Sequence, residues 1–456
     1  MPSDSHITPA PEGASKADPG LPTVTPPSGS MFFRLFGVPA LIVGGLVLVL
    51  ILAQPLLNKA GKFFVGRSWG TSSPEQFLRD LDNPNKEVRW RAANDLAQEL
   101  PRDDTLASDS AFALQLAQRL RKVLDTSAPF EKTYAEQFAK LSADEKTREV
   151  AKLEPDRQYI SFLAQALSHF VVPVGAPLLE EMAVQTSGLD PRALSQRRQQ
   201  ALLALANLGD NLKKFDKLSS EQQEAIKSQL ETAAHSGDQG ALAKTTLEYL
   251  VHRQEGHPNA LGVDKVIVTC ADAEDPLLRK WTAIAASFWS GTPEENARIE
   301  KALLRLSDDT GKGADELAKL EEQKPPETGN LLNKFVEKEQ TRSLTKKPGF
   351  GVQAQATIAL ARQGWKVRLG LLQTMLDEDE LRGIFVIQSK KDGAERPDEA
   401  IVVLTVINAL KAIVELHGKR PDLDLSRLRP NLDKLAHNPN PAVHTEAGRV
   451  VLALSK

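Results

Sequence analysis

The fold is decided by the stretch Leu81-Asp-Asn-Pro-Asn-Lys-Glu-Val88-Arg89-Trp-Arg-Ala92-Ala93-Asn-Asp-Leu96-Ala-Gln-Glu-Leu100. Its Asn-Pro-Asn segment is typical of a tight turn that closes one helix before the next begins. Val88, Ala92, Leu96 and Leu100 then recur at four-residue steps, which places them on one face of the following helix. Because alanines share that face, a neighbouring helix can approach closely. The stretch therefore predicts two helices joined by a short turn.

This pattern resembles the HEAT repeat family, whose units carry an Asp/Asn-Pro turn, a Val-Arg pair, and then an Ala-Ala and Leu pattern on the second helix. A repeat should recur at a fixed interval. Similar frames begin at five later positions: Arg197, Leu242, Leu278, Val352 and Val443. The 355 residues from Val88 to Val443, taken as nine intervals, give a mean near 39, beside the ~40–47 of HEAT and armadillo repeats. The resemblance implies an α-solenoid.

The rest of the body also favours helices. Ala, Leu, Glu, Lys, Gln and Arg dominate it, and apolar residues recur with helical periodicity in 156–170, 193–208 and 276–289. The run from Pro397 to Leu410 is rich in β-branched residues, but its length and the continuing pattern to Leu416 favour a buried helix over a strand. We predict an all-α chain, and the alternative to the solenoid is an irregular helical domain.

A membrane span is predicted before this body. No charged side chain occurs from Leu35 to Asn58, and the apolar residues cover every helical face, which meets the usual threshold of about 18 apolar residues for a spanning helix. Phenylalanines and Trp69 flank the run, as aromatic residues do at membrane interfaces. The alternative is a cleaved signal peptide starting at Met31, but its apolar run would be unusually long.

Charge outside the span bears on orientation and on partners. Three cations follow the span closely whereas only Arg34 precedes it, so the positive-inside rule places the body in the cytoplasm. Residues 68–456 carry 52 basic and 57 acidic side chains. Because this balance has no net attraction for phosphate backbones, nucleic acid is not expected as a partner.

The predicted organisation follows the chain. Its parts are a disordered Pro-rich tail (1–30), a transmembrane helix (33–58), a linker (59–72), the N-terminal part of the HEAT-like solenoid (73–306) with an exposed charged insertion (127–154), a flexible linker with short helices (307–348), and the C-terminal part of the solenoid (349–456). Ser73-Pro74 has the capping residue and first-turn proline of a helix start.

Signatures of catalysis and of cofactor or metal binding are missing from the sequence. Gly311-Lys-Gly313 lacks the spacing of a phosphate-binding loop, His252 and His257 lack a metal-binding frame, and Asp377–Glu380 lacks the offsets of a calcium loop. The single cysteine, Cys270, is expected to be a small buried apolar residue. We therefore expect no enzyme, no cofactor, no metal and no small-molecule substrate.

The predicted function is that of a single-pass membrane scaffold whose repeats bind protein partners on a concave face, as HEAT arrays mostly do by resemblance. The alternatives are a HEAT-like enzyme of the lyase type and a purely structural spacer. Arg89, Trp90 and Arg91 are the candidate partner contacts, because Trp and Arg are over-represented in interface hot spots. Arg89 has a second interpretation, as a bridge to an acid in the adjacent repeat.

Overall fold

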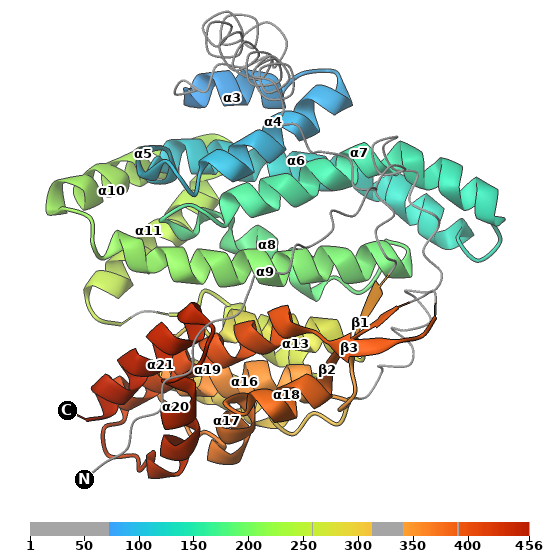
Figure 1. Cartoon of the computed structure of the whole chain (residues 1–456). Helices are drawn as coiled ribbons and strands as arrows, with labels where there is room; N and C mark the ends of the chain where they lie inside the picture. Colours follow the sequence, from blue (N-terminus) through green and yellow to red (C-terminus); the bar gives the residue numbers. More distant parts are fainter. Residues whose placement is uncertain (1–72, 258, 312–340, 390–391, 456) are drawn as a thin grey trace, which may run out of the picture. The chain divides into compact units, whose positions relative to one another are not determined.

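The computed structural model describes residues 73–257, 259–311, 341–389 and 392–455. The predicted tail, transmembrane helix and 59–72 linker lie outside these residues, as does 312–340 of the predicted linker 307–348. Residues Ser73–Lys456 form one unit, within which most described residues are helical (Figure 1). This confirms the predicted helical class.

The helices follow one another along the chain with a small sheet near the end. The α-helices are α3 (Pro74–Leu81), α4 (Lys86–Glu99), α5 (Asp104–Ala107), α6 (Ser110–Gln137), α7 (Ala143–Leu167), α8 (Ala176–Val184), α9 (Pro191–Phe215), α10 (Ser220–Ala234), α11 (Gly240–Gln254), α12 (Val263–Ala271), α13 (Pro276–Ala286), α14 (Pro293–Leu306), α16 (Phe350–Gln363), α17 (Leu369–Met375), α18 (Glu378–Ile384), α19 (Glu399–Lys419), α20 (Arg429–Leu435) and α21 (Pro441–Leu454). Short 3-10 turns are η2 (Pro173–Gly175), η3 (Gly237–Gln239) and η5 (Ser426–Leu428), and the strands are β1 (Thr341–Thr345), β2 (Phe385–Ser389) and β3 (Glu395–Pro397).

Seven helices form a row in which each packs against the next. The order of the row is α4, α7, α9, α13, α16, α19 and α21, and Figure 1 shows α9 lying between α7 and α13. Beside this row, α6, α8, α12 and α14 pack in the same successive way. The arrangement follows from helices whose apolar residues occupy more than one face, so that each helix is covered on both sides.

Five of the six sequence frames lie on this row, in α4, α9, α13, α16 and α21. The frame at Leu242 lies on α11, which packs mainly against α10. The row takes six steps from Val88 to Val443, fewer than the nine intervals into which the sequence was divided. The reason is that α6, α7 and α9 are each at least 25 residues long and that α10 and α11 stand beside the row.

Side-chain caps fix several helix starts at the predicted turns. The Asn85 side chain accepts a hydrogen bond from the Glu87 amide at the start of α4, and Asn440 does the same for Ala442 and Val443 of α21. Such caps satisfy amides that the helix itself leaves unpaired. Ser73 differs from expectation because its side chain makes no capping bond, although Pro74 does open α3.

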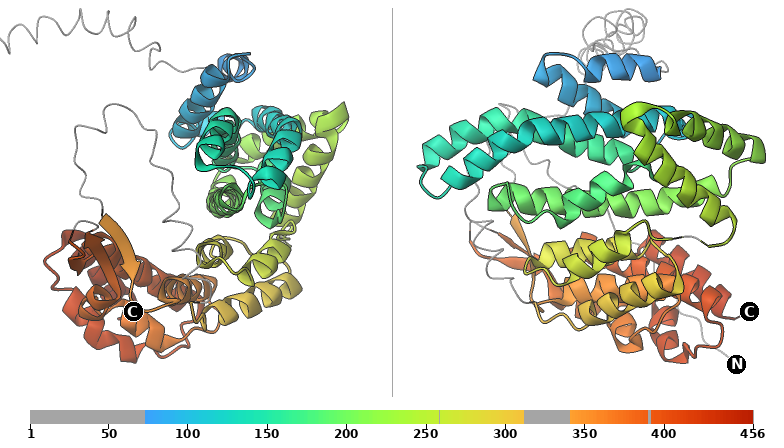
Figure 2. Two further views of the ribbon diagram at one scale, coloured as in Figure 1. Left: turned by 90° about the vertical axis from the view of Figure 1, so that its right-hand side faces the viewer. Right: turned by 180° about the vertical axis from the view of Figure 1, so that it is seen from behind.

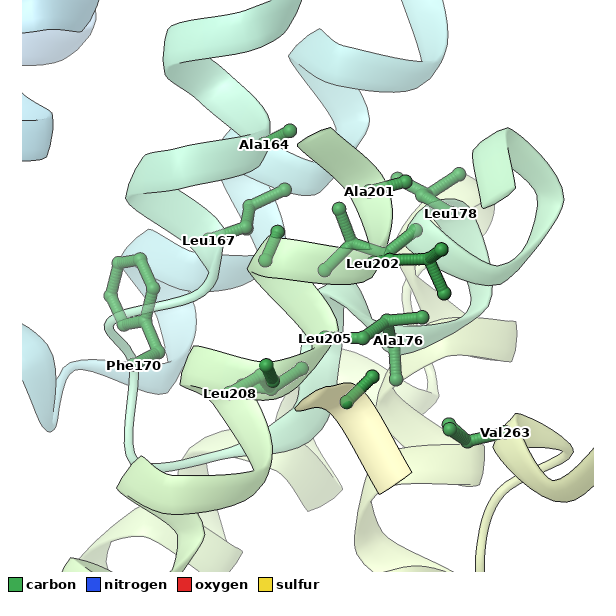
Figure 3. Close-up of a cluster of buried hydrophobic side chains, with 14 of the residues drawn as sticks. Ala164, Leu167, Phe170, Ala176, Leu178, Ala201, Leu202, Leu205, Leu208 and Val263 are labelled. Carbon is green, nitrogen blue, oxygen red and sulfur yellow. The ribbon is translucent and has the colours of Figure 1, made fainter. Parts of the chain in front are cut away.

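Two apolar cores meet at α16. The first extends from Phe77 through Leu360, and Figure 3 shows its part between α7, α8, α9 and α12. The second gathers α16 to α21. Val352, Ala356 and Leu360 of α16 belong to the first core, whereas its other face supplies the second core with Phe350, Ala354, Ile358 and Ala361. One helix therefore serves both cores.

A three-stranded antiparallel sheet, in the order β1-β2-β3, departs from the all-helical prediction. Thr341 pairs with Ser389 and Thr345 with Phe385, while β3 pairs with the other edge of β2. β1 falls within the predicted linker. Phe385 and Val386 are buried where the sheet meets the second core. The strands span at most five residues, too short for an alternating pattern to be distinct in the sequence.

Helix α19 is, among the described residues, the one helix that is long and apolar enough to cross a membrane. Its apolar side chains pack in the second core, and Val402, Val406, Ala409 and Ile413 are fully buried there. Length and composition alone do not separate a spanning helix from the core helix of a folded domain. The run is helical, as predicted from its length, and not a strand.

Substituting Gly209 with alanine should destabilise the body. Gly209 is buried on α9, and a Cβ there would lie 2.8 Å from Trp289 Nε1 and 3.0 Å from Phe288 Cβ. Trp289 is held in place because its indole donates to the Leu205 carbonyl at 2.7 Å. We expect Gly209→Ala to lower the free energy of unfolding by about 1–3 kcal/mol, the usual cost of overpacking. Urea denaturation measures this change.

The matched control for Gly209→Ala is Gly448→Ala on α21. A Cβ at Gly448 would meet no atom within 4 Å, so alanine should be neutral or stabilise by up to ~1 kcal/mol through its higher helix propensity. Equal unfolding midpoints for the two variants would contradict the close packing of α9 against Phe288 and Trp289, which follow α13.

Candidate functional site

A cleft of about 1480 Å³ lies among α4, α6, α7 and the start of α11. Its walls come from 81–89, from the second half of α6, and from 149–159 of α7. α6 and α7 form a long hairpin whose connection, around Ser142, extends past α9 (Figures 1 and 2). The charged stretch 127–154 is this hairpin's outer part, and most of its residues are helical and exposed.

Phe130 gives the cleft an exposed aromatic side chain. It follows Pro129 inside α6 and is 69% exposed, the most exposed of the large apolar side chains in the described part of the body. Pro129 leaves the helix without one backbone donor. Tyr134, one turn further on, also lines the cleft, but its ring is buried and packs edge-on against Phe138 at 5.8 Å. Phe130 is thus available to a ligand.

Six basic and four acidic side chains line the cleft. Asp156 binds both Lys86 (2.7 Å) and Arg89 (3.3 Å). Arg121 binds Glu181 at 2.7 Å in an exposed pair. Lys122 is exposed, and its ammonium group has no ion-pair or hydrogen-bond partner among the described residues. The lining therefore carries a small surplus of positive charge.

Tyr159 and Arg89 stiffen the wall formed by α4 and α7. The Tyr159 hydroxyl donates to the Leu81 carbonyl at 3.1 Å, and burial raises the pKa of this phenol to about 12. The Arg89 guanidinium lies over the Tyr159 ring, 5.5 Å from its centroid. Since the same guanidinium pairs with Asp156, Arg89 is held from both sides. Arg89 thus pairs with an acid on another helix, where the sequence had suggested an acid in an adjacent repeat.

The other two candidate contacts lie away from the cleft lining. Trp90 donates to Glu87 at 3.0 Å and stacks on Phe162 with ring centroids 6.2 Å apart. Arg91 is 68% exposed, and its guanidinium lies over the Trp90 ring. Of the predicted trio, Arg89 alone lines the cleft. Phe130 was not singled out from the sequence, although it is one of three aromatic residues in the charged stretch, with Tyr134 and Phe138.

A buried ion network anchors the α6–α7 hairpin below the cleft. Arg157 of α7 donates to both oxygens of Glu131 at 2.8 and 2.6 Å, and to Asp190 at 2.7 Å. Asp190 also caps α9 by accepting from the Ala193 amide. The side chains of Glu131 and Asp190 are 2% and 5% exposed. Burial opposes the charge of Arg157, but the bonds to Glu131 and the charges of both carboxylates raise its pKa overall.

A second buried group of charges lies between α8 and α12. Asp264 accepts from Arg298 at 2.8 Å, while Asp264 Oδ1 and Glu180 Oε1 are buried without a hydrogen-bond partner in the described structure. Gly262, with φ of +96°, brings backbone against Glu180, since a Cβ there would lie 2.8 Å from Glu180 Oε2. Burial, together with the Asp264 charge, raises the pKa of Glu180 to about 8.

Within the described residues, no group of three or more His, Cys, Asp and Glu side chains could hold a metal ion. Cys270 is buried, as predicted, and burial raises the pKa of its thiol. This thiol lies 3.7 Å from the Arg198 guanidinium, on α9. A buried thiol with a raised pKa is a poor nucleophile.

Comparisons with known proteins identify no relatives for this chain. No family model matches, and no curated protein matches. Two crystal structures of engineered proteins align with 84% and 85% of this chain and with 97% and 100% of their own, at 15% and 14% identity and TM-scores of 0.29 and 0.19. Matches this weak establish neither a family nor a function.

Proposed function

We propose that this chain is a membrane-anchored scaffold of HEAT-like helical repeats that binds a protein segment in the cleft between α4, α6 and α7. The observation that carries the proposal is Phe130, an aromatic side chain 69% exposed on the wall of a large cleft. Large aromatic side chains supply much of the binding energy at protein interfaces when a partner covers them.

The row of packed helices supports the proposal that the body consists of HEAT-like repeats. Each member contacts its predecessor and its successor, which is how solenoid units bury their apolar surfaces. Two arginines at corresponding positions of the sequence frames, Arg89 and Arg279, each pair with an aspartate on a later segment, Asp156 and Asp309. These bridges would link successive units of a HEAT-like array.

The chemistry of the cleft defines the partner. An apolar side chain of the partner would cover Phe130, and an acidic side chain would meet the exposed cation Lys122, whereas Arg121 already binds Glu181. Charges at the rim would mainly accelerate association, whereas the aromatic contact would set the dissociation rate. The partner is therefore a protein segment with an apolar anchor beside an acidic residue.

We propose residues 33–58 as the membrane anchor and place the body in the cytoplasm. Support comes from the uncharged run Leu35–Asn58 and the cations behind it. Helix α19 is the weaker candidate, because its apolar side chains already pack in the second core.

Photocrosslinking in intact membranes tests the cleft. A photoreactive phenylalanine at position 130 should give a discrete adduct with a protein partner. The matched control is the same residue at position 452, where Leu452 is 61% exposed but lies outside the cleft lining. Adducts at 130 but not at 452 are expected. Equal adducts at both positions would refute specific binding, and none at either would favour the spacer.

A further inference from the structure

A small pocket between α7 and α9 is separate from the cleft. Its volume is about 110 Å³, and Gln158, Ser161, Gln196 and Gln200 line it around Arg197. Gln196 and Gln200 are exposed at the pocket, one turn apart on α9, whereas Arg197 is buried. Since a water molecule needs roughly 15 Å³ of such space, the pocket has room for a carboxyl group and the carbon next to it.

Arg197 is a buried cation whose donors are unused. Its side chain is 9% exposed, and its nearest acidic atom, Glu131 Oε1, is 3.9 Å away, beyond hydrogen-bond distance. Within the described structure, its guanidinium makes no hydrogen bond. The neighbouring Arg198, by contrast, donates to the Ala183 carbonyl. A guanidinium carries five N–H donors. No Arg197 nitrogen is among the fully buried, unpartnered side-chain atoms of the described residues, so these donors remain accessible at the pocket that Arg197 lines.

The nearby carboxylates already accept hydrogen bonds from side chains other than Arg197. Glu131 and Asp190 both bind Arg157, and Glu154, at the pocket, accepts from Gln158. Three carboxylates (Glu131, Asp190 and Glu154) and two guanidiniums (Arg157 and Arg197) surround the pocket, so a doubly charged anion such as phosphate would meet more repulsion than a singly charged one. A carboxylate brings one charge, and its two oxygens match the planar guanidinium fork.

We propose that this pocket binds a carboxylate, which accepts hydrogen bonds from Arg197 while the glutamine amides at the mouth hold the group that carries it. The carboxylate is either a free small acid or an acidic group of a protein chain. The site does not depend on the proposed cleft function, because the two pockets share no lining residue.

Thermal unfolding of the full chain with small probes tests the site. Sodium acetate should raise the melting temperature by about 2 °C at ten times its dissociation constant, relative to sodium chloride at equal ionic strength. Acetamide, the neutral analogue of the same shape, should not. If acetamide and acetate have equal effects, or if chloride matches acetate, the proposal is overturned without the need for any variant.

Variants locate the effect, and larger probes identify the source. Arg197→Gln should abolish the acetate response, whereas Arg192→Gln, an equal charge change at an exposed position of α9, should keep it. A full response in Arg197→Gln would overturn the site. Tighter binding of acetylglycine or of acetyl-aspartate amide than of acetate would assign the carboxylate to a chain terminus or to an acidic side chain; tightest binding of acetate would assign it to a free acid.

Discussion

Replacing Arg157 with methionine should lower the free energy of unfolding by about 3–5 kcal/mol, the usual cost of removing one partner from a buried ion pair. The substitution leaves Glu131 and Asp190 buried without the cation that binds both of them. Both carboxylates must then either remain charged in a buried setting, with Arg197 as the nearest cation to Glu131, or take up protons. Urea denaturation at pH 7 measures the loss.

Two comparisons make this prediction specific. Arg121→Met breaks an exposed pair with Glu181, whose side chains are 42% and 57% exposed, and should cost less than ~1 kcal/mol. Replacing Glu131, Arg157 and Asp190 together by Gln, Met and Asn should recover part of the loss, because neither carboxylate is then buried without its cation. Arg197, whose ion partner is Glu131, keeps the recovery incomplete. If Arg157→Met costs no more than Arg121→Met, the network does not anchor the hairpin.

The stability of the body should fall as pH rises from about 4.5 to about 8 because of Glu180. Its folded-state pKa of about 8 exceeds the ordinary value of 4.5, so in this range the folded chain holds a proton that the unfolded chain releases. The stabilising contribution is complete below the unfolded pKa and is lost as pH rises through the folded pKa. Asp264 and Lys265 also act on this carboxyl, and Arg298 pairs with Asp264.

Glu180→Gln should remove this loss. At pH 9 the variant should exceed the parent in free energy of unfolding by about 2–4 kcal/mol, a value reduced for partial solvent access, and at pH 5 the two should nearly agree. Glu181→Gln, next in sequence but in an exposed pair, should not flatten the pH profile. Urea titrations at several pH values measure this, and parallel profiles for the parent and Glu180→Gln would refute the buried carboxyl.

Local signals in the sequence predicted much of the helical fold. The Asn-Pro turns predicted the starts of α4 and α21, where Asn85 and Asn440 supply the caps. The apolar run of α19 is longer than a typical strand, and for this reason it was predicted to be a helix despite its β-branched residues. In each case the deciding interaction lies within a few residues along the chain, so that a short stretch of sequence contains it.

Long-range interactions could not be predicted in this way. Glu131 stands in a charged run typical of an exposed helix, and its burial depends on Arg157, 26 positions later, and on the approach of α9. Strands β1 and β2 pair residues that are 40 to 48 positions apart. The cleft forms only where α4, α6 and α7 come together, so the sequence did not show that Phe130 would line it. Arg89 was considered as a bridge from the local Val-Arg pattern alone.

The double use of α16 has a consequence for how disturbances spread through the body. Because opposite faces of one helix complete two apolar cores, a rotation that improves the fit on one face must worsen it on the other. Strain introduced among α17 to α21 would therefore rotate α16 about its axis and so disturb its packing against α13 and α14. We expect the two apolar cores to unfold together rather than one after the other.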